Sequence, residues 1–198
     1  MFRLTAPSED EVRRFIAEQG GSRFSYLEVG ASAGDIPSGY NLDHNRIRLG
    51  TGEVTWRRGV AAIRGWQMFK IPWVHLYWPN APIQVGTEVA VSVDHFGFHS
   101  LNACRIVYIV DEDGPIRRFG FACGTLREHA ESGEERFTVE WRRNEDEVWY
   151  DVLAFSRPRK MAARLAYPLS RQLQRKFAEA SKLAMLRAAS TAGADSPP

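Results

Sequence analysis

A histidine and three glutamates lie close together in the stretch His129-Ala-Glu131-Ser-Gly-Glu134-Glu135. Imidazole titrates near neutral pH, so a histidine beside a carboxylate is suited to general acid–base catalysis. His129 and Glu134 are therefore the candidate catalytic residues. The alternative is a solvated acidic loop between two strands, and we favour this alternative because connecting segments usually run over the surface.

A second pair of histidines, His95 and His99, flanks a Phe-Gly-Phe turn beside Asp94. Histidines at this spacing suit a metal ion when both lie on one helix face, but these two lie at a predicted hairpin without an evident third ligand. We therefore predict no metal site. His44 and Asp151 are weaker candidates for chemistry, because an aspartate in a strand can pair with an arginine across the sheet. The sequence has no glycine-rich nucleotide-binding loop, and we expect no cofactor.

Basic residues gather near the C-terminus. Residues 157–187 hold nine lysines and arginines against one acid, Glu179, whereas the rest of the chain is net negative. The same segment has an apolar sector at helical spacing, and basic residues lie on the opposite sector. The proposed anion-binding residues among them are Lys160, Arg164, Arg171 and Arg175. Such a stripe can contact an anionic membrane or a nucleic acid, although a solvated polar face is the commoner outcome.

The two cysteines, Cys104 and Cys123, lie on either side of a turn signal. Asp113-Gly114 is typical of a two-residue hairpin turn, and a turn centred there would place the two cysteines directly opposite each other. Tyr108 would then face Phe119 across the same hairpin. Opposed residues have Cβ atoms about 4.5–5.5 Å apart, wider than a disulfide needs, so we predict two reduced, buried thiols.

The elements that must position these residues change character at Pro72. Before it, we predict a helix from a Ser8 capping box to Gln19, a strand over 23–29, an extended segment over 40–49 and a helix over 52–64. After it, alternating residues separated by turn signals predict an antiparallel meander. Its six strands are expected over 73–78, 87–95, 101–110, 117–125, 134–142 and 148–156. A final helix over 159–188 would cover the apolar face of this sheet.

Length and composition indicate one folded domain, since the chain has 198 residues and 44% of them are hydrophobic. No apolar run is long enough to cross a bilayer, and the N-terminus lacks the apolar region of a secretion signal. With only two cysteines, a reducing compartment fits, and we expect a cytoplasmic protein. We divide the chain into an N-terminal helix-and-strand extension over 1–39, a domain over 40–188 and a disordered tail over 189–198.

Four stretches carry a resemblance to a known family. They are Asn41–Gly50, Ser100–Tyr108, Glu131–Phe137 and Trp149–Pro158. Each is similar to sequences of a bacterial and plant domain of unknown function, which is placed in the START and birch-pollen-allergen superfamily. The resemblance implies an α+β helix-grip fold, in which a curved antiparallel β-sheet wraps around a long C-terminal α-helix. Proteins of this superfamily mostly hold hydrophobic ligands between sheet and helix, and some are cyclases or hydratases.

The leading functional hypothesis is a binding protein for a small hydrophobic or amphipathic ligand held between the sheet and the final helix. The predicted ligand-binding residues are Tyr108, Phe119, Phe121, Phe137, Val139, Trp141 and Leu169. One alternative is a cyclase- or hydratase-like enzyme that uses the same cavity, with His129 or Glu134 as its acid or base. The other is an interaction module that docks on an anionic membrane or nucleic-acid surface through the basic helix.

Overall fold

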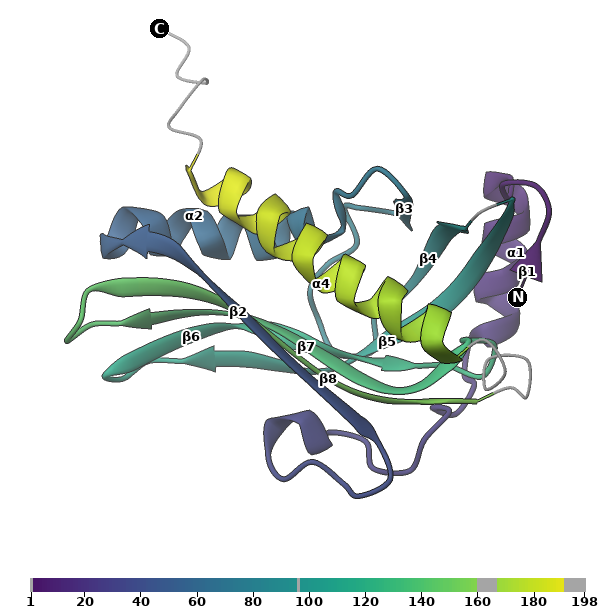
Figure 1. The fold of residues 1–198 in the computed structure, drawn as a ribbon, viewed down its shortest axis with the longest axis horizontal. Helices are drawn as coiled ribbons and strands as arrows, with labels where there is room; N and C mark the ends of the chain where they lie inside the picture. The colour runs from purple at the N-terminus through teal and green to yellow at the C-terminus, as the bar shows by residue number, and fades with distance from the viewer. Residues whose placement is uncertain (1, 96, 160–166, 191–198) are drawn as a thin grey trace, which may run out of the picture.

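A computed structural model of the protein describes residues 2–95, 97–159 and 167–190 (Figure 1). This part of the chain contains the helices α1 (Glu9–Gln19), α2 (Gly52–Arg64) and α4 (Tyr167–Ser190), and the 3-10 helices η1 (Ala31–Ala33) and η2 (Gln67–Phe69). Its strands are β1 (Phe2–Arg3), β2 (Asn41–Thr51), β3 (Val74–Tyr77), β4 (Glu88–His95), β5 (Phe98–Glu112), β6 (Ile116–Thr125), β7 (Glu131–Arg142) and β8 (Glu147–Pro158). The six strands predicted after Pro72 are confirmed.

The strands form one antiparallel sheet in the order β2-β8-β7-β6-β5-β4-β3, with β1 pairing to β5 off this path. Strands β3 to β8 are neighbours in chain order, which confirms the predicted meander, and β2 pairs with β8. The sheet is curved. Helices α2 and α4 lie on its concave side, and the segment around η1 lies on its convex side (Figure 1). This is the expected α+β helix-grip arrangement.

Helix α1 begins at the predicted capping box. The Ser8 backbone N–H donates to the Glu11 carboxylate at 2.8 Å, and the Glu11 backbone N–H donates to the Ser8 hydroxyl at 3.4 Å. Val12 and Phe15 lie on the inner face of the helix and are buried with Leu126 of the β6–β7 connection. The N-terminal segment is therefore packed against the sheet.

Helix α2 covers one half of the concave face, and that half is filled by side chains. Gly59 allows the close approach of α2 to β7, because a Cβ atom at this position would lie only 2.9 Å from Cγ1 of Val139. Just beyond the helix, Trp66 meets the ring of Phe121 edge-on with 4.8 Å between centroids. Met185 of α4 is fully buried in the same cluster. Aromatic and aliphatic groups thus occupy the space between α2 and the sheet.

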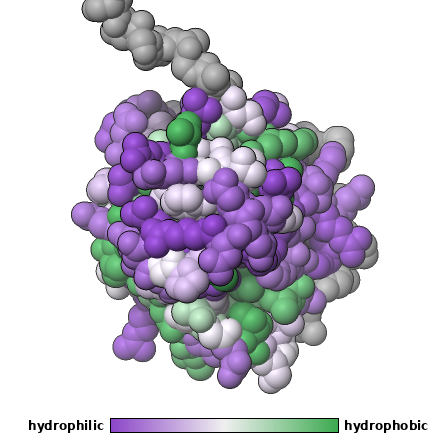
Figure 2. Space-filling view, turned by 90° about the vertical axis from the view of Figure 1, so that its left-hand side faces the viewer, coloured by the Kyte–Doolittle hydropathy of each residue, from purple (hydrophilic) through white to green (hydrophobic). Residues whose placement is uncertain are grey.

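The end of the molecule at which α2 begins carries the tips of the β5–β6 and β7–β8 hairpins. Its surface is mainly hydrophilic, with apolar residues in small scattered groups (Figure 2). Ion pairs hold the two tips, with 2.7 Å between Arg143 and Asp113 and 3.5 Å between Arg142 and Glu145. This end is an ordinary solvated surface, and the hollow part of the concave face lies further along the sheet.

Three predicted elements differ from the structure. Residues 23–29 form turns and a single β-bridge between Phe24 and Leu126, so the predicted strand is wrong. The final helix is described over Tyr167–Ser190, residue 159 is not helical, and residues 160–166 lie outside the described residues. The predicted tail begins too early, because Ala189 belongs to α4 and is only 2% exposed; residues 191–198 lie outside the described residues.

Candidate ligand-binding cavity

A cavity of about 780 Å³ lies between the concave face of the sheet and the first half of the described part of α4. Its floor is formed by the strands β2 and β4 to β8, and its roof by α4 and η2. Most of the wall is apolar. The aliphatic and aromatic side chains that line it include Phe69, Val89, Val91, Phe137, Val152 and Phe177.

Strand register determines which polar side chains reach this cavity. Asp43 on β2 is paired with Ala154 on β8, Ala154 is paired with Glu135 on β7, and Glu135 is paired with Cys123 on β6. Directly paired residues of neighbouring strands point to the same face of a sheet, so these four side chains form one row across the floor. All four line the cavity.

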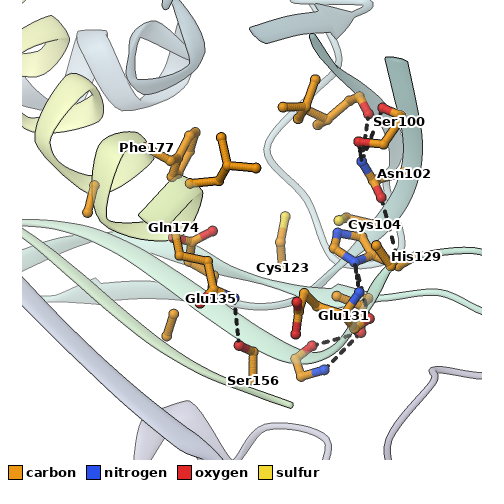
Figure 3. Close-up of a pocket in the computed structure, with 18 of the residues that line it drawn as sticks. Ser100, Asn102, Cys104, Cys123, His129, Glu131, Glu135, Ser156, Gln174 and Phe177 are labelled. Carbon is orange, nitrogen blue, oxygen red and sulfur yellow. Dashed lines mark hydrogen bonds between the residues drawn. The ribbon is translucent and has the colours of Figure 1, made fainter. Parts of the chain in front are cut away.

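The wall opposite α4 carries a group of polar residues that satisfy one another (Figure 3). The side-chain amide of Asn102 donates to the hydroxyl of Ser100 at 3.2 Å, and its oxygen accepts from the backbone N–H of Ala130 at 3.3 Å. His95 Nε2 lies 2.8 Å from the same Ser100 hydroxyl, and burial lowers the pKa of His95 from its usual 6.5. This wall is therefore polar without carrying a fixed charge.

The candidate base His129 does line the cavity, but one of its ring nitrogens is already occupied. Nδ1 lies 3.0 Å from the backbone nitrogen of Glu131, within hydrogen-bond distance of the backbone of that residue. The Glu131 carbonyl oxygen also lies 3.1 Å from Nδ1. Burial lowers the pKa of His129 to about 4. At neutral pH the ring is therefore uncharged, and it is a weaker base than an ordinary histidine.

The predicted catalytic residue Glu134 is directed to the other side of the sheet. Its carboxylate accepts hydrogen bonds from the Tyr26 hydroxyl at 2.6 Å and from the backbone N–H groups of Gly30 and Ser32 at 2.8 and 3.0 Å. It also bonds to the Ser32 hydroxyl and is only 2% exposed. These bonds hold residues 26–32 in turns, which explains why the strand predicted over 23–29 does not form. Glu134 therefore has a structural role that leaves it unavailable for acid–base chemistry.

The same loop contains a motif that sequence reasoning missed, Gly30-Ala-Ser32-Ala-Gly34, which has the Gly-x-Ser-x-Gly spacing of hydrolase nucleophiles. In the structure Ser32 lies in η1 and not at a turn between a strand and a helix. Its hydroxyl is buried and contacts Tyr108 at 2.7 Å as well as Glu134. No described histidine contacts this serine. Ser32 thus lacks the base that a nucleophilic serine requires.

The neighbouring Glu135, another glutamate of the same stretch, has a carboxyl group that faces the cavity (Figure 3). It has no hydrogen bond or ion pair with any other described residue. Burial, and secondarily the negative charge of Asp43, raises its pKa from 4.5 to about 8. Alternation along β7 explains the contrast with Glu134, because consecutive strand residues point to opposite faces.

Of the predicted ligand-binding residues, Phe137 lies on the cavity wall. Four others lie in the half of the concave face that α2 covers and do not reach the cavity; they are Phe119, Phe121, Val139 and Trp141. The prediction placed these four residues on the correct, concave face of the sheet. It placed the cavity over the wrong half of that face, because α2 and η2 fill the space above these residues. The side chain of Leu169 lies outside the described residues.

A β-bulge at Val107 turns Tyr108 to the convex face, and the predicted hairpin register is wrong. The turn uses residues 113–115, since Pro115 has no N–H to give to the ladder, so Cys104 pairs with Thr125 and Cys123 with Ile106. The shift is two residues, and both thiols therefore still face the cavity. Both cysteines are free, as predicted. Burial raises the pKa of Cys104 to about 12 and that of Cys123 well above its usual value.

The basic stripe of the final helix is only partly available to an external partner. Arg171 pairs with both carboxylate oxygens of Asp43, at 2.5 and 2.6 Å, and its side chain is 18% exposed. Its assignment to an exposed anion-binding surface is therefore wrong. Arg175 is exposed at the edge of the cavity, whereas Lys160 and Arg164 lie outside the described residues. Within the described residues, no helix has the length and apolarity needed to cross a bilayer.

The remaining candidates form ion pairs on the surface of the sheet. Asp151 on the convex face lies 3.0 Å from Arg46 and 2.6 Å from His44, which fits the expected pairing across the sheet. At the edge, His99 lies 2.7 Å from Asp94. Among the described residues no group of histidine, cysteine and acidic side chains has the arrangement of a metal site.

Residues 25–184 match the family described as Domain of unknown function (DUF1990). The chain belongs to this family. Among its relatives, the UPF0548 protein of Deinococcus radiodurans is 37% identical over 96% of this chain and 99% of its own length. That of Dictyostelium discoideum is 35% identical over 95% of both chains. The crystal structure of a hypothetical protein from Helicobacter pylori is similar with a TM-score of 0.52 and 13% identity, over 83% of this chain and 95% of that one. At such identity the likeness concerns the fold alone. The predicted membership of a family of unknown function and the predicted helix-grip fold are both confirmed.

Proposed function

We propose that this protein binds a small hydrophobic or amphipathic molecule between the sheet and α4. The observation that carries the proposal is the unequal filling of the concave face. Trp66, Phe121 and Met185 fill the half under α2, whereas the other half contains a cavity of about 780 Å³. This volume falls within the range of about 300–1,000 Å³ that is usual for ligand pockets. A cavity costs stability because its lining loses van der Waals contacts, so a ligand that fills it would restore them.

The chemistry of the wall supports an amphipathic ligand. Aliphatic and aromatic side chains from β4, β7 and α4 supply most of the surface, and a few polar groups stand at fixed positions among them. Ser100 and Asn102 mark one side, and Glu135 with Cys123 marks the floor. A ligand with an apolar body and one or two polar groups would match this distribution.

Filling the cavity from its floor tests the proposal. Ala154 lies in the middle of the floor row, between Asp43 and Glu135. We expect Ala154→Phe to abolish uptake of an uncharged solvatochromic dye such as Nile red, while circular dichroism shows that the fold is retained. Ala17→Phe, at an exposed position of α1, adds the same group outside the cavity and serves as the matched control. Equal dye uptake by both variants and the wild type, or no uptake by the wild type, would refute the proposal.

The cavity also bears on the enzyme alternative. His129 is poorly suited to the role of base, because burial lowers its pKa to about 4. Glu134 is fully bonded to the η1 segment. A cyclase- or hydratase-like reaction would therefore need a different acid, and Glu135 is one such group on the cavity floor. Ligand binding requires no catalytic group and is the simpler function.

Docking of the basic helix on an anionic surface stays a prediction. Arg171 is bound to Asp43, so the stripe would depend on Lys160, Arg164 and Arg175. Changing these three residues to Gln is expected to remove salt-sensitive binding to vesicles that contain anionic lipids. If the variant binds vesicles as the wild type does, the basic stripe is only a solvated face of the helix.

A further inference from the structure

The position of Glu135 on the cavity floor leaves its carboxyl group uncovered from both sides. Its paired neighbours on β8 and β6 are Ala154 and Cys123, which are small. The carboxyl group therefore stands in a gap between short, uncharged side chains (Figure 3). A ligand in the cavity has direct access to it.

Potential protein partners of Glu135 are already engaged with other groups. Arg171, which approaches from α4, is held by the two carboxylate oxygens of Asp43. Gln174, the next polar residue of α4, accepts from Arg171 at 2.7 Å and donates to the Ser156 hydroxyl at 3.1 Å. These hydrogen bonds join Arg171 and Gln174 to each other and to the strands β2 and β8, and none of them involves Glu135.

None of the other described ionisable groups that line the cavity forms an ion pair with Glu135. Arg3 of β1 pairs with Glu11, and burial lowers the pKa of His95 on β4. Asp43 on β2 is neutralised by Arg171 on α4, and Arg175 of α4 is exposed at the cavity edge. His129 beyond β6 is neutral at pH 7. The thiols, on β5 and β6, also remain protonated because burial raises their pKa values, and Glu131 on β7 is a further acid. Among the described residues of the cavity, Glu135 is therefore a carboxyl group for which the protein supplies no cation.

We infer that the ligand of this cavity carries a protonated amine, or another cationic nitrogen, which pairs with the carboxylate of Glu135 while its apolar part lies against α4 and β4. This inference rests on the proposed ligand-binding function and specifies the chemical class of the ligand. A carboxylate that is desolvated without a partner is costly, and a cation is the group that best relieves this cost. Hydrogen bonds between a cationic nitrogen and a carboxylate are also about twice as strong as neutral ones.

The inference predicts that protons are released when the ligand binds. With a pKa of about 8, Glu135 carries a proton in most molecules at pH 7. Pairing with an ammonium group requires the carboxylate form, so each binding event releases about 0.9 of a proton at this pH. For the same reason the affinity for an amine is expected to rise about tenfold per pH unit below pH 8 and then to level off. A neutral ligand would release none.

Three probes of equal length separate the outcomes: octylamine, octan-1-ol and octanoate. Titration calorimetry at pH 7 in two buffers of different ionisation enthalpy measures both affinity and proton release. We expect octylamine to bind wild-type protein at least about tenfold more tightly than octan-1-ol, with release of about 0.9 of a proton. Glu135→Gln should remove both the preference and the proton release while octan-1-ol binding is retained. Glu18→Gln, at an exposed site on α1, is the matched control and should behave as wild type.

The outcomes distinguish this inference from the function on which it rests. If octan-1-ol or octanoate binds as tightly as octylamine, the amine inference is wrong and the binding function stands. If none of the three probes binds, the binding function itself is contradicted. If Glu135→Gln keeps the full preference for octylamine, the cation is recognised elsewhere and the inference is overturned.

Discussion

The unpaired carboxyl group of Glu135 should make the stability of the protein depend on pH in an unusual direction. Its pKa is about 8 in the fold, against an ordinary value of 4.5. Between these two values the unfolded chain has lost this proton and the native protein has kept it, so the native protein binds more protons. Stability from this group is therefore lost as the pH rises from about 4.5 to about 8. Most paired carboxylates in proteins act in the opposite direction.

The magnitude follows from the size of the shift. A difference of one pKa unit corresponds to about 1.4 kcal/mol, so the shift of Glu135 is equivalent to about 5 kcal/mol at most. About 3.5 kcal/mol of this would accrue between pH 5 and pH 8. Glu135 is half-buried and faces a cavity that can admit water, which screens its charge. We therefore expect an observed change of about 2 kcal/mol or more.

The assay is urea unfolding of wild type and Glu135→Gln at pH 5 and pH 8. Glutamine keeps the shape and cannot ionise, so the variant should gain about 2 kcal/mol or more relative to wild type on going from pH 5 to pH 8. Glu18→Gln, at an exposed position, should follow the wild type at both values. A difference in unfolding free energy between Glu135→Gln and wild type that is the same at both pH values would refute the reasoning.

Three further predictions follow from the same structure. His129, whose pKa is lowered to about 4, should stabilise the fold above pH 6.5 and lose that contribution as the pH falls towards 4. In urea unfolding, His129→Gln should not show this loss of stability, and an equal loss in the variant and the wild type would contradict the prediction. Phe121→Trp should destabilise the protein by about 1–3 kcal/mol without lowering dye uptake by the folded protein, because Phe121 is fully buried outside the cavity. A stable variant with reduced dye uptake would instead place Phe121 on the cavity wall. Thiol titration should find both cysteines after denaturation and slow reaction in the native protein, since burial raises their pKa values; zero thiols after denaturation would mean a disulfide.

Much of the fold was accessible from the sequence because local signals and hydrophobic alternation agree with it. The Ser8 capping box fixes the start of α1, and the meander follows from alternation between turn residues. Errors occur where a distant contact overrides a local pattern. Residues 23–29 alternate like a strand, but Glu134, more than a hundred residues away, binds the following backbone and holds it in turns. Sequence alone does not show such a partner.

The hairpin register shows a second limit. Asp113-Gly114 is a strong signal for a two-residue turn, but the proline that follows lengthens the turn to residues 113–115. A bulge at Val107 then changes which residues face inward beyond it, so Ile106 lies in the core and Tyr108 does not. The cysteines keep their predicted face only because the shift between them is an even number of residues.

The location of the cavity depends on the connection between β2 and α2. Alternation identifies the concave face correctly, but it gives the same signal along the whole strand. Because α2 begins directly after Thr51, the helix turns back over the near half of the sheet and fills it, which leaves the far half open. An apolar sheet face is packed or hollow depending on the segment that covers it. The sequence of the strand itself does not show which segment that is.

One signal in the sequence does mark the hollow half, and it is the charge on an inward position. Phe137, Val139 and Trp141 are inward on β7, and the same alternation continued backwards assigns Glu135 to the inside and Glu134 to the outside. Both glutamates begin the strand predicted over 134–142, but their charges were interpreted together with the preceding acidic loop, so this parity was not applied. In a packed core an inward glutamate without a partner would be strongly destabilising. An inward acid on an otherwise apolar strand face therefore favours a core that is open at that point, where a ligand can supply the missing charge.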